Sequence, residues 1–172
     1  MIDVIRKIIK PKYKSLNTIE ILKDNLIHNL SYLSSLQEQA EMFPVLKSNA
    51  YGHGLKEICQ ILNETLVKMV AVDSFPEAQI VYKYFKGKVL ILSEMPLKAY
   101  RYCKLKRTEF AVYNDDTIKY LPKFGKKANV HLFLNTGMNR EGIDNLELFL
   151  ENNKKYINKV EINGVCSHLA QA

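Results

Sequence analysis

The sequence feature that most constrains the fold is a regular alternation of short apolar runs with longer segments of helical periodicity. Apolar runs bounded by turn residues are typical of buried strands. Such runs lie at 43–46, 69–72, 89–92, 110–113, 130–134 and 162–166. Helices are predicted between them at 55–64, 75–84, 97–106, 114–121 and 146–152, and the second of these opens with Ser74 and Glu77 at the spacing of a capping box. Strands that alternate with helices in this way indicate an α/β fold with a parallel sheet of about six strands.

Two forms of this architecture remain open. One is an open doubly wound sheet, and the other is a (β/α)8 barrel of the TIM type. A complete barrel takes about 250 residues, whereas this sequence has 172, so a barrel would be incomplete. Ahead of these units, a strand is predicted at 16–21 and a helix at 22–39. An open barrel leaves edge strands and apolar surface uncovered, which predicts aggregation unless a partner closes it.

The apolar run at 43–46 leads directly into a lysine and a glycine-rich turn, in the string FPVLKSNAYGHG. This order places Lys47 at the carboxyl end of a strand, where parallel α/β folds carry their chemistry. An amine that leaves a dry strand is partly desolvated and can act as a nucleophile that forms Schiff bases. Tyr51, His53 and the glycine N–H groups can then bind an anion such as a phosphate. The alternative is that Lys47 is simply solvated.

Two further polar motifs follow the last two predicted strands. The first is NTGMNREGI, in which Arg140 is a permanent planar cation on the same side of a parallel sheet as the lysine. Its alternative role is a surface ion pair with Glu141 or Asp144. The second motif is CSHLA, in which His168 is either a site residue or an ordinary polar residue at a strand end.

The strings KSNAYGHG, TGMNREG and SHLA resemble motifs of the alanine racemase family and occur in the family's order. The resemblance implies that the chain is the (β/α)8 barrel domain of such an enzyme, with pyridoxal 5'-phosphate as cofactor. It implies that Lys47 holds the cofactor covalently and acts as a catalytic base, and that Tyr51 holds the cofactor phosphate. It also implies that Arg140 contacts the cofactor's ring oxygen and the substrate carboxylate, and that His168 lies against the ring.

The resemblance further implies an isomerase that interconverts L-alanine and D-alanine, with D-alanine used for cell-wall peptidoglycan. Family members act as homodimers, and their C-terminal β-domain supplies a tyrosine base to the partner subunit. No counterpart of that domain is visible, so we expect an N-terminal fragment or one half of a split enzyme. The alternatives are a non-catalytic protein that binds pyridoxal phosphate and a racemase for serine, lysine or ornithine.

Two positions depart from the family pattern. Phe133 stands where many relatives carry a carbamylated lysine that braces the arginine, and a phenylalanine can form no carbamate. Asn135 stands where an aspartate is common, which removes a charge. We therefore expect Arg140 to need a different brace or to be oriented more loosely.

The composition excludes several other classes of protein. The net charge is +7, but the basic residues are scattered, which argues against nucleic-acid binding. Cys59, Cys103 and Cys166 form no CxxC pair, so we expect no disulfide framework, no metal site and a reducing cytoplasm. No apolar stretch is long enough to predict a membrane span. Residues 1–15 are predicted to be a basic N-terminal arm, and 16–172 the barrel domain.

Overall fold

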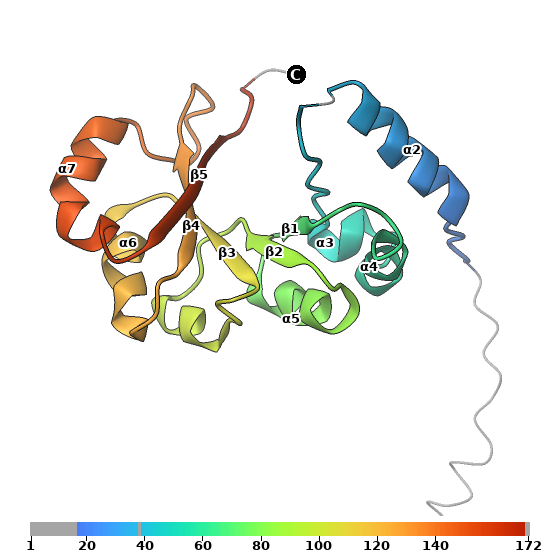
Figure 1. Cartoon of the computed structure of the whole chain (residues 1–172), viewed down its shortest axis with the longest axis horizontal. Coiled ribbons are helices and arrows are strands. Elements are labelled where there is room, and N and C mark those ends of the chain that lie inside the picture. Colours follow the sequence, from blue (N-terminus) through green and yellow to red (C-terminus); the bar gives the residue numbers. More distant parts are fainter. Residues whose placement is uncertain (1–16, 38, 171–172) are drawn as a thin grey trace, which may run out of the picture.

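The computed structural model describes residues 17–37 and 39–170, and the basic arm predicted at 1–15 lies outside them. Strands alternate with helices through this part of the chain (Figure 1). The strands are β1 (Met69–Val72), β2 (Lys88–Ile91), β3 (Thr108–Val112), β4 (Asn129–Leu134) and β5 (Glu161–Ser167). The helices are α2 (Lys23–Ser35), α3 (Lys47–Tyr51), α4 (Leu55–Leu62), α5 (Phe75–Tyr84), α6 (Asp115–Tyr120) and α7 (Leu146–Ile157), with 3-10 helices η1 (Leu97–Tyr102) and η2 (Leu121–Phe124).

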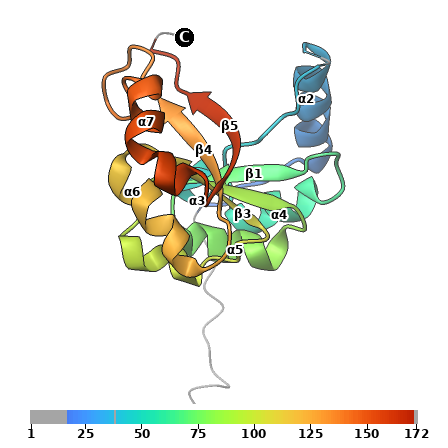
Figure 2. The same ribbon diagram turned by 60° about the vertical axis from the view of Figure 1, so that its left-hand side comes forward.

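The five strands form one parallel sheet in the order β1-β2-β3-β4-β5, so each strand pairs with its neighbour in the sequence. Helices α4 to α7 lie along one side of the curved sheet, as the two views in Figures 1 and 2 show. A right-twisted sheet that grows by one β/α unit at a time is the start of a (β/α)8 barrel. The fold is therefore an incomplete barrel of the TIM type, as the sequence predicts.

Most of the sheet is buried on both faces, because alternate side chains of a strand point to opposite sides. The face under the helices carries fully buried side chains, among them Val70, Val72, Val89, Ile91 and Val112. The inner face carries a second apolar set, Met69, Ala71, Leu90, Ala111, Tyr113 and Phe133. Burial on both faces explains why these strands are visible in the sequence as continuous apolar runs.

A polar cluster interrupts the inner face near the amino ends of the strands. The Glu109 side chain is only 3% exposed, and its two oxygens accept hydrogen bonds from Lys88 Nζ at 2.8 Å and His131 Nε2 at 2.6 Å. Burial opposes ionisation of Glu109, but these hydrogen bonds outweigh it and lower its pKa. His131 is thus a partner of a buried carboxylate.

Two predicted strands are not formed. Residues 17–22 have no regular secondary structure, so the strand at 16–21 is wrong for its described part. The run at 43–46 makes a single parallel bridge, between Val45 and Ala71. Two backbone hydrogen bonds hold this run to β1, from Leu46 N to the Ala71 carbonyl and from Ala71 N to the Pro44 carbonyl, before the chain turns at Lys47. The sheet thus holds five strands and one bridged segment where six strands were expected.

The predicted helices are formed with shifts at their ends. Helix α5 has the predicted bounds, whereas the helix expected at 97–106 is a 3-10 helix that stops at Tyr102, because Cys103 is extended. Helix α2 lies beside α4, and Leu33 within it and Leu22 and Leu36 at its two ends are exposed. None of the helices in the described ranges is a candidate for crossing a lipid bilayer.

Candidate active site

The residues singled out in the sequence all follow parallel strands or the bridged segment. Lys47 comes two residues after the bridge at Val45, Arg140 lies in the loop after β4, and His168 directly follows β5. Since all of these segments run in the same direction, the three side chains lie at the carboxyl end of the sheet. This is the end at which barrel enzymes assemble their active sites.

The short helix α3, which begins at Lys47, is a left-handed turn. Ser48, Asn49, Ala50 and Tyr51 have φ angles of 55, 55, 53 and 52°. Each non-glycine residue in this conformation costs about 1–2 kcal/mol, and only asparagine among these types adopts it readily. The sequence predicts a glycine-rich turn here, but nothing in the residue types predicts that the strained positions precede the glycines. Lys47 itself is half-buried, and Tyr51 is 59% exposed.

Asn49 joins this left-handed turn to its surroundings. Its side-chain oxygen accepts a hydrogen bond from Leu55 N at 2.8 Å, and its carbonyl accepts one from Gly54 N at 3.0 Å. Its backbone N–H donates to Glu77 Oε1 at 3.2 Å. These bonds fix the turn against the start of α4 and against the first turn of α5.

Glu77 also corrects the capping-box prediction for α5. Ser74 is the N-cap residue, but its side chain makes no cap hydrogen bond. Glu77 Oε2 instead accepts from Asp73 N at 3.0 Å, one residue ahead of the cap. The Ser-x-x-Glu spacing therefore marked the correct residue, although its carboxylate serves a neighbouring loop in addition to its own helix.

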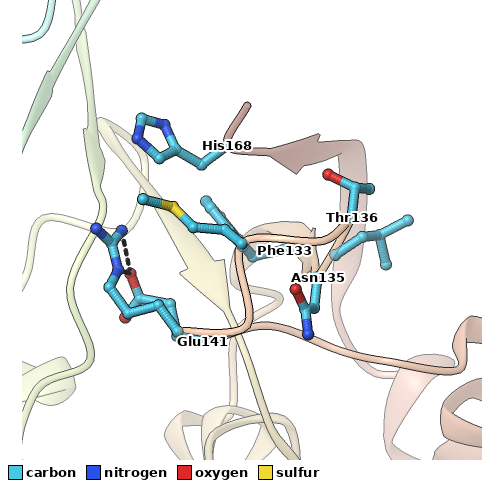
Figure 3. A pocket seen from close by; sticks show the side chains of 8 residues that line it. Phe133, Asn135, Thr136, Glu141 and His168 are labelled. Atoms are coloured by element: carbon cyan, nitrogen blue, oxygen red, sulfur yellow. Dashed lines mark hydrogen bonds and ion pairs between the residues drawn. The ribbon is translucent and has the colours of Figure 1, made fainter. Parts of the chain in front are cut away.

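Arg140 and His168 line one pocket between the ends of β4 and β5 (Figure 3). The other lining residues are Phe133, Leu134, Asn135, Thr136, Met138 and Glu141. The Arg140 side chain is 56% exposed, and its Nε and Nη2 donate to Glu141 Oε1 at 3.2 and 2.8 Å. Of the two pairings weighed from the sequence, Glu141 is the partner of Arg140. This is the surface ion pair that the sequence left open as the alternative role of Arg140.

Phe133 has a packing role on the inner face. Its ring lies 4.7 Å from the ring of Tyr113, centroid to centroid, and the Tyr113 hydroxyl donates to the Leu92 carbonyl. Burial raises the pKa of Tyr113 well above its ordinary value, so the hydroxyl stays protonated. Position 133 is therefore one half of an aromatic pair on the inner face.

Asn135 organises the loop that carries Arg140. Its Oδ1 accepts from Gly137 N at 3.2 Å and Asn139 N at 3.0 Å, while its Nδ2 donates to Asp144 Oδ1 at 2.7 Å. A carboxylate could make the first two bonds but not the third. The Asn135 amide therefore both accepts hydrogen bonds within the loop and donates one to the Asp144 carboxylate.

The structure brings some of the predicted site residues together and separates others. Arg140 and His168 share the pocket, whereas Lys47 and Tyr51 lie on the left-handed turn, next to β1 at the other end of the strand order. In a barrel the two ends of such an order curve around one mouth. The fold and these side chains define a partial (β/α)8 barrel domain with cationic groups around the carboxyl ends of its strands.

Comparison with known proteins identifies the family of this barrel domain. Residues 21–172 match the model of the alanine racemase N-terminal domain. Alanine racemase of Fusobacterium nucleatum is 32% identical over 157 residues, which cover 90% of this chain and 44% of the relative. Alanine racemase 2 of Caldanaerobacter subterraneus is 30% identical, over 88% of this chain and 41% of the relative. The chain belongs to the alanine racemase N-terminal domain family.

Solved structures agree with this assignment. Alanine racemase from Oenococcus oeni has a TM-score of 0.79 and 27% identity, over 88% of this chain and 46% of the solved chain. Alanine racemase from Bartonella henselae with covalently bound pyridoxal phosphate also has a TM-score of 0.79, with 26% identity over 88% of this chain and 44% of the solved chain. The chain spans less than half the length of these relatives.

Proposed function

We propose that this chain is the cofactor-binding part of a pyridoxal-phosphate-dependent amino-acid racemase that interconverts L-alanine and D-alanine for peptidoglycan synthesis. The family membership of residues 21–172 carries the proposal. Its support in the structure is the common position of Lys47, Arg140 and His168 at the carboxyl end of one parallel sheet. The rest of the enzyme would come from a longer polypeptide or a second chain, and the complete enzyme would be a homodimer.

The donor groups suit pyridoxal phosphate. A half-buried primary amine at Lys47 is the group that an aldehyde requires. The exposed Tyr51 hydroxyl, beside Gly52, is suited to a phosphate oxygen. The Arg140 guanidinium suits a phenolate oxygen and a substrate carboxylate, and the His168 imidazole is suited to lie against the ring.

Racemisation removes the Cα proton on one face of the amino acid and returns one on the other, so it needs two bases. When bound, pyridoxal phosphate supplies the electron sink that acidifies this proton. In our proposal, Lys47 takes the proton on one face and Arg140 orients the substrate carboxylate. The buried tyrosines Tyr82 and Tyr113 are engaged, with Thr108 Oγ1 at 2.5 Å and with the Leu92 carbonyl. We assign the second base to the missing part.

The proposal predicts covalent capture of the cofactor by Lys47. The chain would be incubated with pyridoxal phosphate, reduced with borohydride and digested, and the modified lysine located by mass spectrometry. Lys47→Ala should abolish the adduct, whereas Lys98→Ala, which removes an exposed lysine of η1, should leave it unchanged. Equal labelling of many lysines, or no label on Lys47, would contradict the proposal.

The state of the cysteines supports a reducing compartment. Cys59, Cys103 and Cys166 are all free thiols in the structure, and burial raises the pKa of each to about 11. Protonated thiols of this kind are poor nucleophiles. A cytoplasmic location is therefore part of the proposal.

A further inference from the structure

The two carboxylate oxygens of Glu77 bind two segments that are far apart in the sequence. Oε1 accepts from Asn49 N at 3.2 Å, and Oε2 accepts from Asp73 N at 3.0 Å, with Ser74 Oγ at 3.5 Å from the same oxygen. Asn49 lies in the left-handed turn, two residues after Lys47. Asp73 directly follows β1. One side chain thus ties the lysine turn to the carboxyl end of the strand beside it.

A carboxylate is well suited to accept hydrogen bonds from both segments. Both of its oxygens are acceptors, so it satisfies two N–H groups at once. A glutamine of the same length would offer one acceptor and turn its amide N–H groups toward the second donor. Hydrogen bonds to a charged group are also stronger than neutral ones. A glutamate at position 77 is therefore suited to bind the two N–H donors, Asn49 N and Asp73 N.

The left-handed turn makes such an anchor necessary. Its non-glycine residues are held in a conformation that an isolated chain would leave. The turn's own bonds, Ala50 N to the Leu46 carbonyl at 2.8 Å and Gly52 N to the Ser48 carbonyl at 3.0 Å, leave Asn49 N to an outside partner. Glu77 is that partner.

We propose that Glu77 is a positioning residue for Lys47: by holding Asn49 N, it keeps the strained turn, and with it the lysine amine, in a fixed place at the barrel mouth. The role of Lys47 in this inference rests on the proposed function. The hydrogen bond by which Glu77 holds the turn does not depend on the cofactor. These two parts can be measured separately.

The first measurement is amide hydrogen exchange of the whole chain without cofactor. Glu77→Gln should raise the exchange rate at Asn49 about tenfold, as expected for the loss of one charge-assisted hydrogen bond. Glu147→Gln is the matched control, because Glu147 lies in the first turn of α7 and its loss removes the same charge from a helix start. Unchanged exchange at Asn49 in Glu77→Gln, or an equal rise throughout the sheet, would overturn the anchor.

The second measurement is the rate at which pyridoxal phosphate is captured by Lys47, trapped with borohydride at successive times. Glu77→Gln should slow capture about tenfold and leave the final amount unchanged, because the amine is still present. Glu147→Gln should capture at the wild-type rate, and melting temperatures check that both variants are folded. A wild-type rate in Glu77→Gln overturns the positioning role. If the wild-type chain captures nothing on Lys47, the proposed function fails, while the exchange result still decides whether Glu77 holds the turn.

Discussion

Glu109 and His131 form a hydrogen bond of 2.6 Å on the inner face of the sheet, where the Glu109 side chain is almost fully buried. Lys88 approaches the same carboxylate from the neighbouring strand. A charge buried in this way stabilises the fold only while it is ionised and all of its partners are in place.

This cluster predicts a pH-dependent contribution to stability. Because the pKa of Glu109 is lowered in the folded state, its contribution is present above the ordinary pKa of a glutamate and is lost as the pH falls through the lower folded value. Glu109→Gln should therefore lower the free energy of unfolding by about 1–3 kcal/mol near neutral pH. Urea denaturation at neutral and acidic pH would test this. A difference between wild type and variant that does not shrink in acid would argue against it.

Gly142 is predicted to be irreplaceable in the Arg140 loop. Its φ is +125°, and a Cβ there would lie 2.6 Å from Asn135 N, a backbone atom that cannot move aside cheaply. Gly142→Ala should cost at least about 2 kcal/mol of unfolding free energy. Gly125→Ala is the control: its φ is also positive, at +68°, but nothing lies within 4 Å of the added carbon. Equal melting temperatures for the two variants would refute the steric argument.

Asn135 and Asp144 are predicted to be energetically coupled. Asn135→Asp would replace the 2.7 Å amide–carboxylate hydrogen bond by two facing carboxylates and should lower stability by about 1 kcal/mol. Asp144→Asn in the same chain should restore most of the loss, because one acid and one amide are again present. A double-mutant cycle measured by thermal melting gives the coupling. Additive effects would mean that the two side chains do not interact.

The chain loaded with pyridoxal phosphate is predicted to act on one face of its substrate. With D-alanine in deuterated water, we expect deuterium at Cα without L-alanine, because our proposal assigns to this chain the Lys47 base alone. Nuclear magnetic resonance and chiral chromatography would measure the two products. Adding the C-terminal part of a relative should then give L-alanine. Full racemisation by the unsupplemented chain would show that it holds a second base.

The sequence predicts those elements that depend on neighbouring residues. β1 and α5 have their predicted bounds because a doubly buried apolar run and a segment of helical periodicity are local signals. The run at 43–46 is also apolar but forms only a single bridge, and the described part of the run at 16–21 forms no strand. Strand formation is a property of the pair of segments, so a single sequence cannot reveal this difference.

The site shows the same division between local and distant causes. Arg140 and His168 come after β4 and β5, and Lys47 after the bridged segment, so all three lie at the carboxyl end of the sheet. The residues that hold the loops of the site in place were harder to predict from the sequence. Ser48, Ala50 and Tyr51 carry no signal for a left-handed turn, and the bond from Asn49 to Glu77 joins residues in separate β/α units. Only the Ser-x-x-Glu spacing hinted at Glu77.

The order of the strands has a consequence for how the molecule comes to be folded. Each strand after β1 pairs with the strand that precedes it in the chain, so β2 to β5 need no later segment in order to find a partner. Contacts between near neighbours in the chain form quickly, because little loop entropy is lost in making them. The sheet can therefore be assembled during synthesis, from β1 to β5, with each new β/α unit added to a finished edge.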